Sequence, residues 1–298
     1  MDSPPLVSVI CLCFNHADYV QQAIQSVWDQ EYPNIELIVV DDASSDGSVE
    51  KIKAKLRGTS TNFIALKVNQ GNCHSFNQGF FQSKGDYLID LAADDLLLPT
   101  RISEGVAAFQ QQDIGVHFCD TYFIDPDGRQ LGEHYQRNEE GQLQEKVPEG
   151  RVYEELIKRY FISAPTMMMK RAVLEALGGY DETLSYEDFD FWIRSARTQR
   201  YGFTDRLLVK KRVLPHSLSK KQFRFRSRHQ RSTLSVCKKI YALNRNAVED
   251  KALIGRCLYE TRQCLKMLNL EYIPSFLLLA LKAKWRKNYR KQQEDSAT

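Results

Sequence analysis

Short, continuously apolar runs alternate with helix-like patterns over the first hundred residues of the chain. Residues 7–14, 35–40, 63–68 and 86–91 are rich in β-branched and other apolar side chains, which is typical of strands buried on both faces. Between these runs, apolar residues recur at helical spacing. Because parallel strands need a long, usually helical connection, we expect an α/β fold with a mostly parallel central sheet.

Polar or acidic residues follow three of these predicted strands. Asn15 follows the first strand, Asp41-Asp42 the second, and Asp94-Asp95 the fourth. Ligands of open parallel sheets bind beyond the carboxyl ends of the strands, and clustered carboxylates repel one another unless a cation lies among them. Carboxylate oxygens favour Mg²⁺ or Mn²⁺. We therefore expect a metal-held diphosphate here; the alternative is that each acid caps the following helix.

Several common motifs are missing from the sequence. The chain contains no G-x-G-x-x-G after the first strand, no G-x-x-x-x-G-K-[ST] and no H-E-x-x-H. This disfavours dinucleotide oxidoreductases and P-loop phosphotransferases. The seven cysteines include no C-x-x-C pair, so we expect free thiols in a reducing compartment.

The formal net charge of +3 hides a division of the chain into an acidic and a basic part. Residues 1–209 contain 19 basic and 32 acidic residues, whereas residues 210–298 contain 22 basic and 6 acidic residues. Nucleic-acid-binding proteins are usually basic throughout, so we expect no nucleic-acid partner.

The end of the basic part combines an apolar run with a basic, Trp-containing segment. Residues 273–281 are mostly apolar, and Lys282, Lys284 and Trp285 follow them. This pattern is typical of a helix that lies on an anionic membrane surface; the alternative is packing on the rest of the protein or on another subunit. The chain has neither a run of about 18 apolar residues nor a signal-peptide pattern at its start. We expect a cytoplasmic protein, peripheral on the inner face of the cell membrane.

A series of short motifs resembles the pattern of the family 2 glycosyltransferases. The resemblance covers about residues 6–220. The motifs, in chain order, are Leu12-Cys13-Phe14-Asn15, Tyr32-Pro33-Asn34-Ile35, Asp41-Asp42-Ala43-Ser44-Ser45-Asp46-Gly47, Asn69-x-Gly71, Asn77-x-Gly79, Gly85-Asp86-Tyr87, Ala92-Ala93-Asp94-Asp95-x-x-x-Pro99, Gly178-Gly179-Tyr180-Asp181-Glu182 and Glu187-Asp188-x-Asp190-x-Trp192.

The resemblance implies a GT-A fold, which is a Rossmann-like α/β architecture with a mostly parallel central sheet. We expect this domain over residues 1–220, with a nucleotide-sugar half at about 1–115 and an acceptor half at about 116–220. Residues 221–298 would form a basic helical extension outside the family pattern.

The resemblance also implies an inverting, metal-assisted transfer of a hexosyl or N-acetylhexosaminyl group. The donor would be a nucleotide sugar, most simply a UDP-sugar, with Mn²⁺ or Mg²⁺ as cofactor. The acceptor would be a hydroxyl of a glycan or lipid-linked acceptor in bacterial cell-surface polysaccharide synthesis, and the chain is compatible with an oligomer. Two alternatives stay open, a nucleotidyltransferase-like enzyme and a non-catalytic scaffold that binds sugar nucleotides.

Donor-binding residues are implied position by position. Asp42 is similar to the acid that contacts the uracil ring, and Leu12 and Phe14 line the same pocket. Asp94 resembles the residue near the ribose or the metal, and Asp95 the principal metal ligand. The remaining implied donor-binding residues are Asn15, Asn69 and Gly71.

On the acceptor side, Asp188 is similar to the general base that deprotonates the acceptor hydroxyl. Glu187 and Trp192 would lie beside the acceptor, and His216 is an additional candidate metal or phosphate ligand. The sequence departs from the family pattern at Ala92, where an acid is usual, and at Phe76, where arginine is frequent. The acidic start of the helix at Asp188 could also be explained by favourable interaction with the helix dipole.

Overall fold

The computed structural model describes residues 3–214 and 228–297, which form two compact units. The first unit comprises Met1–Arg151, Ile162–Glu182 and Gln199–Leu214; the second comprises Val152–Phe161, Thr183–Thr198 and Pro215–Thr298. This division differs from the predicted boundary at residue 220. Residues 152–161 and 183–198 precede residue 220 but belong to the second unit. Each segment forms a helix whose apolar face is covered by the C-terminal helices.

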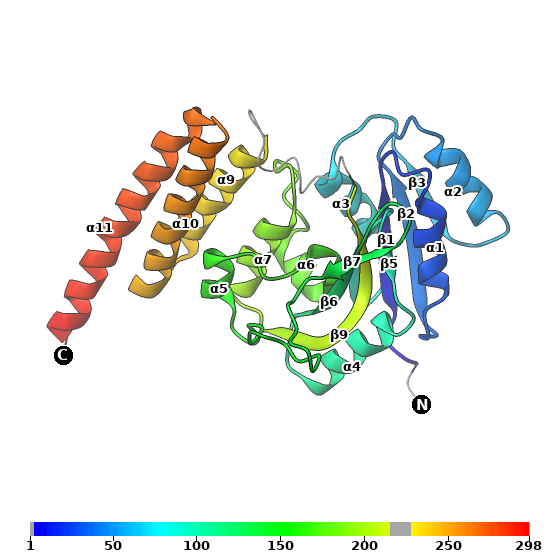
Figure 1. Cartoon of the computed structure of the whole chain (residues 1–298), viewed down its shortest axis with the longest axis horizontal. Coiled ribbons are helices and arrows are strands. Elements are labelled where there is room, and N and C mark those ends of the chain that lie inside the picture. The colour runs from blue at the N-terminus through cyan, green and yellow to red at the C-terminus, as the bar shows by residue number, and fades with distance from the viewer. Residues whose placement is uncertain (1–2, 215–227, 298) are drawn as a thin grey trace. The chain divides into compact units, whose positions relative to one another are not determined.

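The first unit is built on a sheet of nine strands among the described residues, several of which are labelled in Figure 1. Their order is β3-β2-β1-β4-β8-β6-β9-β5, with β7 paired to β6. The strands are β1 (Val7–Cys13), β2 (Ile35–Asp41), β3 (Asn62–Ala65), β4 (Tyr87–Ala92), β5 (Leu96–Leu97), β6 (Val116–Ile124), β7 (Gln130–Glu133), β8 (Met168–Lys170) and β9 (Tyr201–Arg212). The helices of this unit are α1 (Val20–Trp28), α2 (Ser48–Leu56), α3 (Asn72–Gln82), α4 (Arg101–Gln111), the short 3₁₀ turn η1 (Ala164–Thr166) and α6 (Arg171–Leu177).

The expected parallel arrangement is confirmed for β1 to β4. Strand β1 pairs in parallel with both β2 and β4, and β2 pairs in parallel with β3. The other half of the sheet is mixed, since β8 is antiparallel to β4 and β6 while β6 and β9 are parallel. The antiparallel strands β6 and β7 are joined by a turn in which Asp125 Oδ1 accepts the backbone N–H groups of Asp127 and Arg129.

Helices cover both faces of the parallel strands. The fully buried side chains of Val7, Val9 and Cys11 belong to the same core cluster as apolar residues of α1 and α4. On the opposite face α3 packs so closely that a Cβ at Gly79 would lie 2.5 Å from Ile10 Cγ2. A side chain at Gly79 would therefore force α3 away from the sheet, which explains why glycine stands in the Asn77-x-Gly79 motif.

The polar segment 134–149 contains no helix or strand, and one arginine holds it in place. Arg137 donates to Asp120, Glu133 and Asp205, and an isolated antiparallel bridge joins Arg137 to Leu143. Because the Asp120 side chain is fully buried, its charge requires this cationic partner.

The second unit is helical and includes three long C-terminal helices that lie side by side in Figure 1. Its elements are α5 (Tyr153–Lys158), α7 (Asp188–Ala196), α9 (Arg228–Leu243), α10 (Ala247–Lys266), η2 (Leu270–Tyr272) and α11 (Ile273–Ala297). The prediction of a helical C-terminal extension is thus confirmed. Among the described residues, no helix is both long enough and apolar enough to cross a bilayer. All seven cysteines are buried free thiols.

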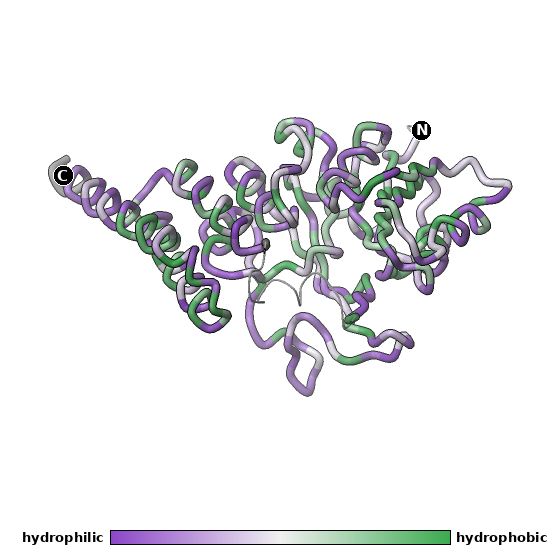
Figure 2. Tube along the Cα trace, turned by 90° about the horizontal axis from the view of Figure 1, so that it is seen from above, coloured by the Kyte–Doolittle hydropathy of each residue, from purple (hydrophilic) through white to green (hydrophobic). Residues whose placement is uncertain are grey.

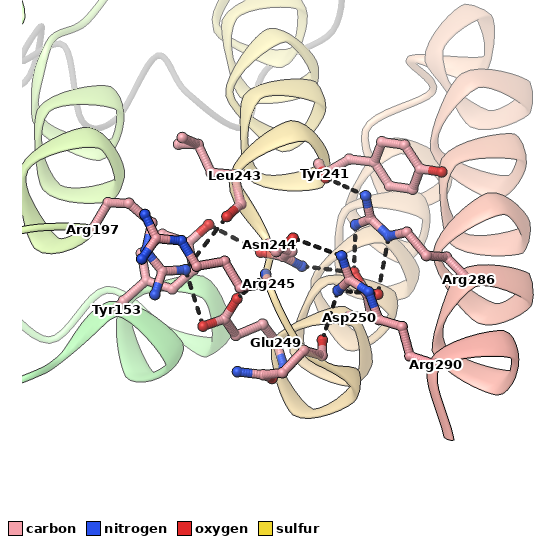
Figure 3. A network of polar contacts seen from close by, with 11 residues as sticks. Tyr153, Arg197, Tyr241, Leu243, Asn244, Arg245, Glu249, Asp250, Arg286 and Arg290 are labelled. Carbon is pink, nitrogen blue, oxygen red and sulfur yellow. Dashed lines mark hydrogen bonds and ion pairs between the residues drawn. The ribbon is translucent and has the colours of Figure 1, made fainter. Parts of the chain in front are cut away.

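A buried polar network joins the helices of the second unit (Figure 3). The fully buried carboxylate of Asp250 in α10 accepts hydrogen bonds from Arg286 and Arg290 of α11. Asn244, at the end of α9, accepts from the Tyr153 hydroxyl and donates to Asp250. Since an unpaired buried carboxylate would be costly, these contacts fix α11 against α10.

Candidate donor and acceptor sites

The three polar clusters predicted at strand ends are brought together in the first unit. In the sheet register, Cys13 lies opposite Asp41, and Leu12 lies opposite both Val40 and Ala92. The three strands therefore end at the same edge. Asp42 and Asp94 follow the two outer strands, with Asn15 between them.

Asp42, Asn69 and Gly71 form one hydrogen-bonded group. Each carboxylate oxygen of Asp42 accepts a backbone N–H, from Gln70 and Gly71, at 2.8 Å. The side-chain amide of Asn69 donates to the Asp42 carbonyl at 3.2 Å. Gly71 has a φ of +91°, in the region that favours glycine. Asp42 thus orders the turn before α3, and its proposed contact with uracil stays a prediction.

The loop after β1 is held by reciprocal contacts with the loop after β2. Asn15 adopts a φ of 57°, its N–H donates to Ser44 Oγ, and its Oδ1 accepts the N–H of Ser45. The neighbouring Phe14 ring is 45% exposed, whereas Leu12 is buried in the sheet. Phe14 is therefore available to stack on a base, and Leu12 contributes mainly to the core beneath.

Asp94 and Asp95 are adjacent and both buried, at 9% and 4% exposure. Burial, and then the charge of Asp94, raise the pKa of Asp95 well above its ordinary value, although Lys211 and Arg212 oppose this shift. Two carboxylates in this environment favour the binding of a cation, which would stabilise their ionised forms. Helix capping does not account for them, because α4 begins only at Arg101.

Arg212, at the end of β9, is a site residue that the sequence did not single out. Its backbone N–H donates to Asp95 Oδ1 at 2.8 Å, and its Nε donates to the Asp94 carbonyl at 3.0 Å. Its guanidinium lies 4.5 Å from the centre of the Tyr19 ring. Nothing in the local sequence marks this arginine, because its partners lie 117 and 118 residues earlier in the chain.

His16 is a second residue that sequence reasoning missed. Its Nδ1 lies 3.6 Å from Asp94 Oδ1, and this buried nitrogen has no hydrogen-bond partner in the part of the chain that the structure describes. The only sequence signal was its position directly after Asn15. His16 therefore places a further polar group beside the Asp94 carboxylate.

The donor atoms present fit a divalent cation that is shared with a diphosphate. Within residues 3–214 and 228–297, no group of three or more His, Cys, Asp or Glu side chains could hold an ion alone. Mg²⁺, however, is commonly bound by one or two carboxylates together with substrate phosphates and water. Asp94 and Asp95 match that arrangement. His216 lies outside the described residues.

The predicted acceptor-side residues Glu187, Asp188 and Trp192 belong to the second unit. Asp188 is the first residue of α7, Glu187 precedes it, and both side chains are partly exposed. Asp188 Oδ1 accepts the backbone N–H of Phe189 at 2.7 Å. Trp192 is only 2% exposed and packs near Tyr160. The accessible carboxylates, rather than the Trp192 ring, are thus available to an acceptor.

Sequence comparison identifies the family. The profile of glycosyl transferase family 2 matches residues 8–178, and the chain belongs to this family and is a glycosyltransferase. An uncharacterized glycosyltransferase of Methanocaldococcus jannaschii is 29% identical over 70% of this chain and 71% of its own length. One from Rickettsia typhi is 30% identical over 70% of this chain and 64% of its own length. The putative teichuronic acid biosynthesis glycosyltransferase TuaG of Bacillus subtilis is 27% identical over 56% of this chain and 63% of its own length.

Solved structures confirm the predicted GT-A fold. S. aureus TarS in complex with UDP-GlcNAc superimposes with a TM-score of 0.73 at 18% identity, covering 93% of this chain and 81% of that chain. The mannosyltransferase PcManGT of Pyrobaculum calidifontis, in complex with GDP-Man and Mn²⁺, gives a TM-score of 0.63 at 15% identity, over 99% of this chain and 81% of that chain.

Proposed function

We propose that the chain is an inverting glycosyltransferase that moves a hexosyl or N-acetylhexosaminyl group from a UDP-sugar to an acceptor hydroxyl. The observation that carries this proposal is the buried pair Asp94 and Asp95, joined to Arg212 at the edge where β1, β2 and β4 end. Open parallel sheets bind ligands at this edge. The UDP-GlcNAc complex of TarS supports a UDP donor, although the GDP-Man complex of PcManGT keeps a GDP donor open.

Each proposed residue has a chemical task. Asp94 and Asp95 would hold Mn²⁺ or Mg²⁺, which neutralises the negative charge that develops on the departing diphosphate. Phe14 would stack on the base, and Asp42 would fix the turn at Asn69 and Gly71 beside it. Asp188 would take the proton of the acceptor hydroxyl, as a single inverting displacement requires.

Two relatives support our proposal for the acceptor class. TuaG is named for teichuronic acid biosynthesis, and a further relative is a poly-β-1,6-N-acetyl-D-glucosamine synthase of Staphylococcus epidermidis that is 33% identical over 30% of this chain. A glycan or lipid-linked acceptor in cell-surface polysaccharide synthesis is therefore our proposal.

A panel of nucleotide sugars tests the reaction class. The protein with Mn²⁺ is incubated with UDP-GlcNAc, UDP-glucose, UDP-galactose, GDP-mannose and a dTDP-sugar, and released nucleoside diphosphate is measured. We expect UDP release from at least one UDP-sugar, through slow transfer to water or faster transfer to an added glycan. Pyrophosphate release from UTP and a sugar 1-phosphate would instead support a nucleotidyltransferase. Sugar-nucleotide binding without any release would support a scaffold.

We also propose that α11 contacts an anionic membrane surface, which would bring the enzyme to a lipid-linked acceptor. The side chains of Leu278, Leu281, Trp285 and Tyr289 are 52–72% exposed, and their three- and four-residue spacing places them on one face of the helix. Figure 2 shows hydrophobic turns in the first half of α11 and hydrophilic turns toward its end.

The basic residues of α11 differ in whether they have an ion-pair partner. Arg286 and Arg290 point inward to Asp250 (Figure 3). Lys282, Lys284, Lys287 and Lys291 form no ion pair with the side chains that the structure describes. Lys287 lies about 200° around the helix from Trp285, so at most three lysines rather than all six basic residues are available, at about 1 kcal/mol each close to an anionic surface. The same charge disfavours pairing with a second copy of the helix.

Vesicle sedimentation tests this contact. We expect the full chain to sediment with phosphatidylcholine–phosphatidylglycerol vesicles and much less with phosphatidylcholine alone. Leu281→Asp with Trp285→Asp should lower binding at least about tenfold, because each apolar side chain contributes about 1.5–3 kcal/mol on burial. Leu131→Asp, at an exposed leucine of β7, is the matched control and should bind normally. Equal sedimentation of the α11 double variant and the Leu131→Asp control would contradict the proposal. A dimer of the wild-type protein that only the α11 double variant abolishes would also contradict it, because the exposed face would then pair with a second copy.

A further inference from the structure

The segment before α7 is attached to α9 through its backbone. The N–H of Ser185 donates to Ser232 Oγ at 2.9 Å, and the two serine hydroxyls lie 3.0 Å apart. Ser185 Oγ also lies 3.1 Å from Nδ1 of His229. Ser232 is 5% exposed, so water competes little for these contacts. A helix of the basic extension thereby fixes the path of the chain three residues before Asp188.

Thr233 makes the second attachment, to the next residue of the segment. Its Oγ1 lies 2.7 Å from the Tyr186 hydroxyl and donates to the His229 carbonyl at 3.0 Å. Because Thr233 has a single hydroxyl proton, the Tyr186 O–H must be the donor to Thr233. Burial raises the pKa of Tyr186 well above its ordinary value, so this phenol keeps the proton that the hydrogen bond requires.

Lys239 makes the third attachment, on the other side of Asp188. Its Nζ lies 2.5 Å from Asp190 Oδ1, and Arg194 Nε lies 2.6 Å from Asp190 Oδ2. Asp190 is 1% exposed, and the two cations compensate its buried charge. Removing either cation would therefore disturb the first turn of α7.

These attachments bracket the partly exposed pair Glu187 and Asp188. We propose that α9 is the element that positions Asp188, and that Ser232 and Thr233 are positioning residues for the transfer step. This inference rests on the proposed role of Asp188 as the general base. Its physical basis is that a reacting group displaced by about 1 Å can lose about a hundredfold in rate. The basic extension thus belongs to the machinery of the acceptor side, in addition to any contact with a membrane.

Hydrogen exchange tests the positioning without any substrate. Thr233→Val removes the oxygen that accepts from Tyr186 and nearly keeps the side-chain volume, whereas Thr233→Ser restores a hydroxyl. We expect Thr233→Val to speed amide exchange in residues 183–190 at least tenfold, with unchanged exchange in β1, and Thr233→Ser to return it to the wild-type rate. The control is Ser235→Ala, in the same helix, because that hydroxyl donates only to the Arg231 carbonyl. Exchange in Thr233→Val that equals the Ser235→Ala control would overturn the proposal.

Kinetics separate positioning from general loss of structure. With the UDP-sugar that reacts fastest in the panel above, Thr233→Val and Ser232→Ala should each lower kcat about ten- to a hundredfold. The KM for the donor should stay unchanged, and Thr233→Ser should recover kcat. A parallel loss of donor affinity and thermal stability would assign these residues a purely structural role.

The variant Asp188→Asn distinguishes the two hypotheses. If Asp188→Asn keeps full turnover, the proposed base is wrong. If Asp188→Asn is inactive while Thr233→Val and Ser232→Ala match the Ser235→Ala control, the base assignment stands and the role of α9 is wrong.

Discussion

Asp188→Asn is expected to lower the turnover of sugar transfer by about 10²- to 10⁴-fold, the usual contribution of a general base. Asparagine keeps the volume and the Oδ1 that accepts the Phe189 N–H, but it cannot take a proton from an acceptor hydroxyl. The affinity for UDP should stay the same, because the donor-binding residues belong to the other unit. Turnover is measured by UDP release, and affinity by titration with UDP.

The matched control is Glu271→Gln, which neutralises an exposed carboxylate of the same unit. This variant should behave as the wild type. Asp188→Asn with undiminished turnover would exclude Asp188 as the base. A loss of UDP affinity equal to the loss of turnover would place Asp188 in donor binding instead.

Asp95→Asn is expected to remove activity and yet make the protein without ligand more stable. Asp95 is buried beside Asp94, and burial raises its pKa. The neutral amide avoids the cost of a buried charge and can still accept the Arg212 N–H. We expect the free energy of unfolding at pH 7.5 to rise by about 1–2 kcal/mol. This size is typical of substitutions that replace a destabilising group of a functional site. Denaturant unfolding measures this difference.

The pH dependence of that difference follows from the direction of the shift. Because folding raises the pKa of Asp95, the folded protein holds the proton more tightly than the unfolded chain, and wild-type stability falls as pH rises through the folded pKa. The gain in Asp95→Asn should thus be full above the folded pKa and vanish below the unfolded value of about 4. Asp113→Asn, at an exposed acid, should show no such gain. A lower free energy of unfolding for Asp95→Asn than for the wild type would contradict the inferred cost of burying the Asp95 charge.

The parallel half of the fold and the location of the donor site could be predicted from local sequence. The apolar runs that form β1, β2 and β4 are largely buried on both faces. Their own residue types therefore identify them as strands, with little influence from distant parts of the chain. Since parallel strands end at one edge, the positions of Asp42 and Asp94 followed directly. The predicted helix that begins at Asp188 is confirmed for the same reason, because a short-range signal determines it.

Long-range contacts were beyond such reasoning. Arg212 reaches Asp95 from the last strand of the sheet, and Thr233 reaches Tyr186 from a helix that family motifs do not cover. Asp42 binds the backbone of the following turn through contacts that no local pattern encodes. The division into units was equally hidden, because α5 and α7 are completed by helices that come later in the chain.

Titration of the protein with UDP, with Mn²⁺ or with EDTA, tests the central claim most directly. If Asp94 and Asp95 hold a cation that binds the diphosphate, calorimetry should detect UDP binding in Mn²⁺ and at least about a hundredfold weaker binding in EDTA. In Asp95→Asn the affinity in Mn²⁺ should fall to the EDTA level. Equal UDP affinity in EDTA and Mn²⁺, or wild-type affinity in Asp95→Asn, would contradict the account.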